Sequence, residues 1–112
     1  RYGHLPNVCI RKGFSAEILE TFADDYFDWL YIDGNHRYEF VRQDVEVAFR
    51  KVRAGGVIAG DDYFWKKDGK MHVKEAVLDA MRAQGIKNRP DRIGQQFMIT
   101  VPPRNAAGNG HA

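Results

Sequence analysis

Two apolar segments of this chain end in carboxylates, and this pattern limits the folds and sites that the chain can build. Residues 27–32 are almost entirely apolar and run straight into the sequence Asp-Gly-Asn-His at 33–36. Residues 56–60 form a second apolar segment, which is followed by Asp61 and Asp62. A run that is apolar on both faces is typical of a strand in a parallel sheet covered by helices. The sequence therefore predicts two buried strands that deliver acidic side chains at their carboxyl ends.

Amphipathic segments separate and follow these strands. Apolar residues recur at three- and four-residue spacing over residues 38–53 and again over residues 72–84, which predicts two helices. The glycine pair at 55–56 is expected to end the first helix, because glycine tolerates left-handed backbone. The other predicted elements are a strand at 8–12, a helix at 16–22 and a strand at 96–101. Strands that alternate with crossover helices predict an α/β fold, with a Rossmann-like, mostly parallel sheet and flanking helices.

Size and charge exclude several classes of protein. The chain has 112 residues, enough for one domain, and a formal net charge of only +2, which does not argue for a nucleic-acid partner. We interpret a local group of lysines (Lys66, Lys67, Lys70 and Lys74) as a solvated face rather than a binding patch. No apolar run is long enough to span a membrane and no signal peptide is recognisable, so we expect a cytoplasmic protein. The single cysteine, Cys9, excludes an internal disulfide.

The acidic residues after the two strands form a candidate metal site. Ligands of open α/β sheets bind at the carboxyl edge, where Asp33, His36, Asp61 and Asp62 are all expected. Adjacent carboxylates repel each other, and a divalent cation that favours oxygen ligands, such as Mg²⁺, would relieve this repulsion. His36 could then accept a proton from a hydroxyl group that the metal orients. The alternative is that the carboxylates face solvent or cap turns and that His36 is an ordinary surface residue.

Two aromatic residues follow the second pair of carboxylates. Tyr63 and Trp65 could form the wall of a substrate pocket beside Asp61 and Asp62, or they could simply pack against the rest of the domain. The sequence alone does not decide between these two readings.

The order of these motifs resembles the second half of the class I S-adenosylmethionine-dependent methyltransferases. Residues 27–63 contain a strand ending in D-G-x-H, a helix, a Gly-Gly turn and a strand ending in D-D, with Ala54 where proline is usual. The most similar subset is the metal-dependent sugar O-methyltransferases of the macrocin and mycinamicin type. The resemblance implies that Asp33, Asp61 and Asp62 hold Mg²⁺ and that His36 is the general base. It also implies methyl transfer to a small-molecule hydroxyl, for which the subset suggests a sugar.

The resemblance covers only part of that family's fold. The cofactor site of the family lies mainly on two earlier strands and a glycine-rich loop, so residues 1–104 correspond to the C-terminal part of a methyltransferase domain and 105–112 to a flexible tail. Gly13, Phe14 and Ser15 would line the adenosylmethionine site. We expect the isolated chain to be inactive and to need its N-terminal half or a homo-oligomer, because one sheet edge would be exposed. The alternatives are a non-catalytic α/β interaction module and, less favoured, a metal-dependent hydrolase.

Overall fold

A computed structural model of the chain describes residues 7–10, 19–32 and 37–103. Its elements, in chain order, are β1 (Asn7–Ile10), β2 (Phe27–Ile32), α2 (Tyr38–Lys51), β3 (Val52–Gly60), α3 (His72–Ala83), β4 (Asp91–Ile93) and β5 (Gln96–Thr100). The predicted helix at 16–22 lies mostly outside the described residues, and the predicted tail at 105–112 lies wholly outside them.

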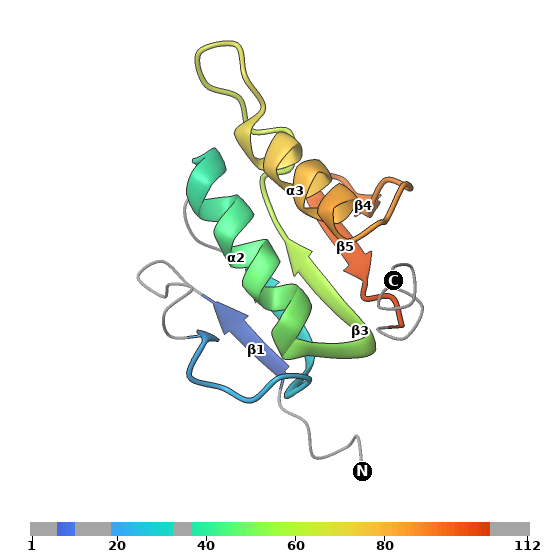
Figure 1. The fold of residues 1–112 in the computed structure, drawn as a ribbon. Helices are drawn as coiled ribbons and strands as arrows, with labels where there is room; N and C mark the ends of the chain where they lie inside the picture. Colours follow the sequence, from blue (N-terminus) through green and yellow to red (C-terminus); the bar gives the residue numbers. More distant parts are fainter. Residues whose placement is uncertain (1–6, 11–18, 33–36, 104–112) are drawn as a thin grey trace.

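One five-stranded sheet organises the molecule, with the strand order β1-β2-β3-β5-β4 (Figure 1). β2 pairs in parallel with both β1 and β3, whereas β5 is antiparallel to both β3 and β4. The α/β class is thus confirmed, with a parallel part and an antiparallel hairpin at the opposite edge. β4 was not predicted, because its three residues are all exposed and carry no apolar alternation.

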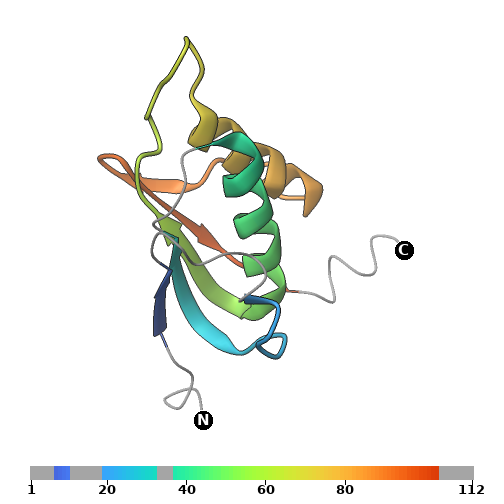
Figure 2. The ribbon, with the colours of Figure 1, turned by 90° about the vertical axis from the view of Figure 1, so that its left-hand side faces the viewer.

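Both described helices lie on the same face of the sheet (Figure 2). Val45 of α2 and Val77 of α3 are fully buried there together with Leu30 of β2, in one apolar core. Trp29 and Tyr31 of β2 are only half-buried. Alternate residues of a strand point to opposite faces of the sheet, so these two side chains face away from the described helices. No helix in the described part of the chain has the length and apolar character needed to cross a bilayer.

The glycine pair works differently from its prediction. α2 ends at Lys51, and both glycines lie inside β3. β3 pairs with β2 at Val52 and again from Val57, so that residues 53–56 bulge out opposite a single residue, Asp28. A Cβ added to Gly56 would lie 2.5 Å from the backbone oxygen of Asp28. Glycine is therefore required here for a close approach between two strands, not for ending a helix.

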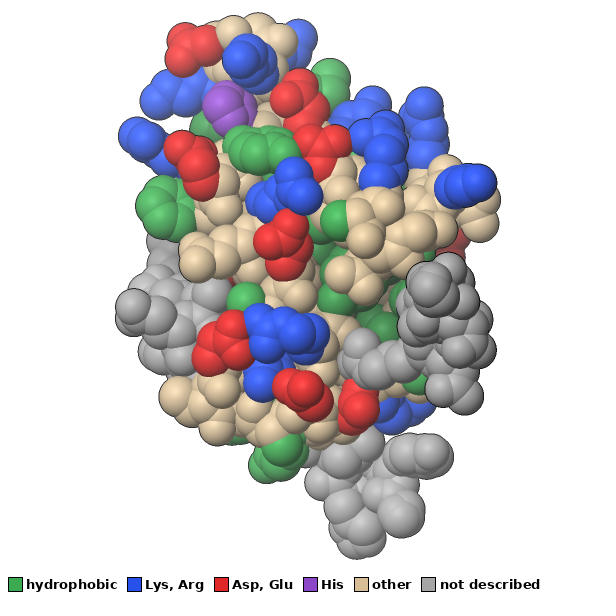
Figure 3. All heavy atoms as spheres, viewed as in Figure 1, with side chains coloured by type: hydrophobic (Ala, Val, Ile, Leu, Met, Phe, Trp, Pro, Cys, Tyr) green, Lys and Arg blue, Asp and Glu red, His purple; other side chains and the backbone are tan. Residues whose placement is uncertain are grey.

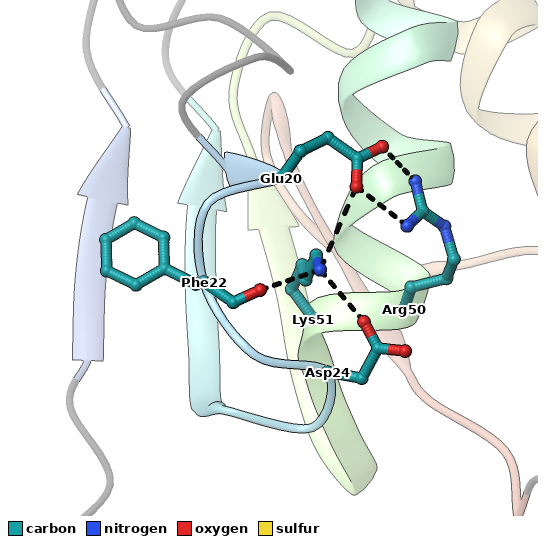
Figure 4. Close-up of polar contacts among 5 residues, drawn as sticks. All are labelled: Glu20, Phe22, Asp24, Arg50 and Lys51. Atoms are coloured by element: carbon teal, nitrogen blue, oxygen red, sulfur yellow. Dashed lines mark hydrogen bonds and ion pairs between the residues drawn. The ribbon is translucent and has the colours of Figure 1, made fainter.

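Charged residues fasten the end of α2 to the loop that precedes β2. Lys51 is 5% exposed, and its Nζ donates to the Phe22 carbonyl at 2.7 Å and to Asp24 Oδ1 at 2.8 Å. The Arg50 guanidinium binds both carboxylate oxygens of Glu20 (Figure 4). We call Glu20, Asp24, Arg50 and Lys51 the base cluster, because it lies at the amino end of the parallel strands. The cluster orients the segment from which β2 begins.

Asp44 of α2 is a buried carboxylate without such partners. It is 8% exposed, and no described residue donates a hydrogen bond to its side chain or forms an ion pair with it. Removal from water disfavours the charged form, and burial raises the pKa of Asp44 to about 6. The ionised carboxylate of Asp44 therefore destabilises the folded state near neutral pH.

Candidate functional site

The register between β2 and β3 sets the position of the candidate site. Ile32, the last residue of β2, pairs with Gly60, the last residue of β3, so the two strands leave the sheet at the same edge. Gly60 is also opposite Phe97 of β5, and a Cβ on Gly60 would lie 2.5 Å from the Phe97 ring. The narrow space between Ile32 and Phe97 therefore requires glycine at this position. It brings Asp61 and Asp62 out at the middle of the sheet edge.

Asp61 and Asp62 form a tight turn after β3. Oδ1 of Asp61 accepts a hydrogen bond from the backbone N–H of Asp62 at 2.7 Å. Asp62 has a φ of 61°, in the left-handed region, and its carbonyl accepts the N–H of Trp65 at 3.0 Å. Both carboxylates are half-buried. The turn thus fixes one oxygen of Asp61.

Gln95, in the turn between β4 and β5, holds the residues that follow. Its carbonyl accepts the N–H of Tyr63 at 2.9 Å, and its side-chain Oε1 accepts the N–H of Phe64 at 3.1 Å. The Tyr63 ring is 2% exposed and lies 5.9 Å from the ring of Phe97. Burial raises the pKa of the Tyr63 hydroxyl, and the positive charges of Arg89 and Arg92 offset part of that effect. The chain after Asp62 is therefore anchored to the antiparallel hairpin.

A projecting loop completes this edge of the sheet (Figure 1). Trp65 is half-buried, and its ring lies 6.1 Å from that of His72, at the start of α3. Lys67 and Lys70 pair through two backbone hydrogen bonds of 2.9 and 3.0 Å. The two residues between them, Asp68 and Gly69, have φ values of 55° and 78°, as in the primed turns of β-hairpins. The loop is thus a short hairpin with its own backbone pairing.

The profile of a family described as a methyltransferase domain matches residues 2–63. The chain belongs to this methyltransferase domain family. The match includes β1, β2, α2 and β3 and ends one residue after Asp62. No curated protein matches the chain.

Solved structures show the same fold for the methyltransferase domain. One is the MycE methyltransferase from the mycinamycin biosynthetic pathway in complex with Mg and SAH, with 20% identity and a TM-score of 0.52. Another is the same enzyme in complex with Mg, SAH and mycinamycin VI, with 19% identity and a TM-score of 0.55. The alignments cover 81% of this chain, but only 31% and 30% of those chains. The domain thus spans about a third of these structural relatives, and its fold is a partial methyltransferase fold.

The structure of the methyltransferase domain places four of the predicted site residues. Asp61, Asp62, Tyr63 and Trp65 follow one another on the edge where β2 and β3 both end. The other predicted site residues, Asp33, His36, Gly13, Phe14 and Ser15, lie outside the described residues. Among the residues that are described, no three His, Cys, Asp or Glu side chains form a group that could hold a metal ion. The convergence of Asp33 and His36 on Asp61 therefore stays a prediction.

The donor set in the methyltransferase domain suits a hard cation as far as it is described. One Asp61 oxygen is occupied by the Asp62 N–H. No basic side chain in the described ranges neutralises the Asp61 carboxylate. Two half-buried carboxylates so close together favour a shared cation, and oxygen ligands are those that Mg²⁺ prefers. These two residues could supply part of a divalent cation site.

Sequence reasoning missed several residues around this site. Gln95 carries no recognisable motif, yet it holds both Tyr63 and Phe64. Lys74 and Arg92 lie over the Phe64 ring, with Lys74 Nζ 5.8 Å and Arg92 Cζ 4.8 Å from its centroid. Arg92 belongs to the strand that was not predicted, so nothing in the sequence indicated its place beside the loop.

Proposed function

We propose that this chain forms the acceptor side of an S-adenosylmethionine-dependent O-methyltransferase. The observation that carries the proposal is the Asp61-Asp62 turn at the edge where β2 and β3 end, inside the residues that match the family. The names of the solved relatives support the cofactors, since those crystals contain Mg and SAH. SAH, S-adenosylhomocysteine, is the product that remains after adenosylmethionine has given up its methyl group.

The proposed reaction is an in-line displacement. The oxygen of the acceptor hydroxyl forms a bond to the methyl carbon, the bond from that carbon to sulfur breaks, and S-adenosylhomocysteine leaves with the electron pair. His36 takes the hydroxyl proton. Asp61 and Asp62, with Asp33, would hold a divalent cation, which when bound would lower the pKa of the hydroxyl and orient it. Most of the rate acceleration would come from positioning the two reactants.

The acceptor is proposed to be a small molecule with a free hydroxyl, and a sugar is the candidate suggested by the mycinamycin VI complex of MycE. Trp65, half-buried beside the carboxylates, would contact the acceptor directly. Tyr63 would border the pocket mainly through the anchored backbone, because its ring packs into the core. Gly13, Phe14 and Ser15 would line part of the adenosylmethionine site.

The test is the paired substitution Asp61→Asn/Asp62→Asn in the full-length enzyme. Losing the cation site should lower kcat by about 100-fold or more, since a metal ion supplies several kcal/mol of charge stabilisation. Mg²⁺ affinity, measured by calorimetry, should fall in parallel. Asp68→Asn is a matched control, because Asp68 is an exposed carboxylate at the tip of the nearby hairpin. If Mg²⁺ affinity is unchanged in the double variant, the metal assignment is wrong.

The alternative is a non-catalytic α/β interaction module that keeps half of the methyltransferase fold. The alignment with a solved methyltransferase covers 31% of that chain, so the enzyme proposal rests on part of its fold. The isolated chain is expected to bind adenosylmethionine weakly or not at all under both proposals. Methyl transfer after addition of a separate cofactor-binding half distinguishes them: activity supports the enzyme, and a stable but inactive complex supports the module.

A further inference from the structure

Two groups of basic residues in the described part of the domain differ in their partners. In the first group each side chain forms an ion pair with a carboxylate, and its members are Arg42, Arg50, Lys51, Arg53 and Arg82. The second group surrounds the projecting loop after Asp62, and we call its members the loop cations: Lys66, Lys67, Lys70, Lys74 and Arg92. Within the described part of the chain, no carboxylate forms an ion pair with any loop cation.

Two of the loop cations come from separate elements and meet on one aromatic ring. Lys74 of α3 and Arg92 of β4 lie 5.8 and 4.8 Å from the centroid of Phe64, within the range of cation–π attraction. Phe64 lies two residues after Asp62, and its backbone N–H is held by the side chain of Gln95. Two of the five loop cations are therefore held on a ring that lies close to the carboxylate turn.

The hairpin itself brings like charges together. Lys67 and Lys70 are direct partners across the two-residue turn, and like charges opposite each other in a strand pair are destabilising. The repulsion between the two lysines lowers the stability of the fold unless a negative charge lies nearby. Asp68 at the tip is the only acidic residue among the described residues of the hairpin. Figure 3 shows several basic side chains at this end of the molecule, with acidic side chains among them. A bound anion would remove the repulsion.

We propose that the loop cations bind the phosphate or diphosphate group of the methyl acceptor. The carboxylates and the loop cations would then bind different parts of the acceptor. Its hydroxyl would lie at Asp61 and Asp62, and its anionic group would lie over the hairpin. Trp65, which follows Phe64 in the chain and is half-buried, could contribute an aromatic surface for a sugar or base ring. The family match ends at residue 63, so all the loop cations lie outside the matched residues. The identity of the ligand as the acceptor rests on the proposed function.

The experiment titrates the 112-residue chain with pyrophosphate and with uridine diphosphate. The chain has two tryptophans, so Trp29→Phe leaves Trp65 as the only tryptophan, which can be excited selectively at wavelengths where tyrosine absorbs little. We expect saturable binding that weakens with added salt, as screening reduces attraction between exposed charges. Uridine without phosphate should not bind. Failure of both anions to give saturable binding would overturn the proposal.

Single substitutions then locate the site. Lys74→Gln and Arg92→Gln should each weaken pyrophosphate binding by about fivefold or more, the effect of losing one charged contact. Lys87→Gln is the matched control, because Lys87 is exposed and unpaired within the described ranges but is not one of the loop cations. It should change binding by less than about twofold. Equal weakening by Lys87→Gln, or equally tight binding of a single-stranded oligonucleotide, would show unspecific attraction and overturn the proposal.

This outcome is separable from that of the proposed function. Pyrophosphate binding requires neither adenosylmethionine nor methyl transfer. Methylation of an uncharged acceptor without anion binding would contradict the proposed anion site and support the proposed enzyme activity. Anion binding that persists in a full-length protein without methyl transfer would keep the anion site and remove the enzyme.

Discussion

The two ends of the sheet carry charge for different purposes. At the amino end, the base cluster pairs every one of its charges, and Arg53 pairs with Asp28 close by. At the carboxyl end, the loop cations have no ion pairs among the described residues, and Asp61 has no basic partner there. Paired charges hold two segments in place, whereas unpaired charges remain available to a ligand. The paired charges stabilise the amino end, and the unpaired charges at the carboxyl end are those to which we assign ligand binding in our proposals.

Glycine substitutions should give the largest difference between the two ends. Gly56→Ala places a Cβ 2.5 Å from the Asp28 carbonyl and 2.6 Å from Val52 Cγ1, so two strands must separate. We expect a loss of about 2–4 kcal/mol in the free energy of unfolding. Gly69→Ala, in the hairpin, meets nothing within 4 Å and suffers only from its φ of 78°, which costs about 1 kcal/mol. Urea denaturation of both variants measures the difference, and equal losses would contradict it.

Lysine substitutions should give a smaller difference. Lys51→Met leaves the Phe22 carbonyl and Asp24 without their shared donor, and we expect a loss of about 2 kcal/mol. Lys67→Met removes an exposed charge that faces Lys70, and its effect should stay within about 0.5 kcal/mol. Thermal unfolding at low and high salt checks both values. If Lys67→Met destabilises the chain as much as Lys51→Met, the hairpin lysines have structural partners and the contrast fails.

Periodicity explains which parts of the fold could be predicted. β2 matches its predicted range, and α2 and α3 begin at the predicted residues and end within two residues of them, because apolar spacing and strand length are local properties. The Gly-Gly pair was misassigned, since the reason for Gly56 is the carbonyl of Asp28, far away in the sequence. β4 escaped prediction because it is stabilised only by pairing with β5 and buries none of its side chains.

The candidate site also contains residues that the sequence predicts and residues that only the folded structure brings together. Asp61 and Asp62 were recognisable because the pair directly follows a buried strand, a pattern that is visible in a short stretch of sequence. Gln95 and Arg92 reach the site from the β4–β5 hairpin, and only the folded sheet brings that hairpin beside Phe64. The lysines were read as a solvated face, since the sequence shows their number but not the absence of paired carboxylates. The convergence of Asp33 and His36 on this edge stays a prediction.

Asp44 is an exception to the pairing of buried charges, because it is buried yet unpaired among the described residues. Burial raises its pKa from 3.8 to about 6, so the folded chain keeps this proton to a higher pH than the unfolded chain does. Its contribution to stability therefore falls as the pH rises from about 4 to 6 and stays low above that range. Asp44→Asn should be about 1–2 kcal/mol more stable than the natural chain at pH 7, with little difference near pH 4.

Urea denaturation across this pH range measures the Asp44 effect, and Asp79→Asn is a control, because Asp79 is paired with Tyr38 and Arg82. A stabilisation by Asp44→Asn that does not depend on pH would rule out titration of this carboxylate as its cause. Destabilisation at pH 7 would mean that the ionised carboxylate has a partner, as the carboxylates of the base cluster do. In that case burial of charge in this domain would always be paired, and the unpaired cations beside Asp61 and Asp62 would stand out further as a place for a ligand.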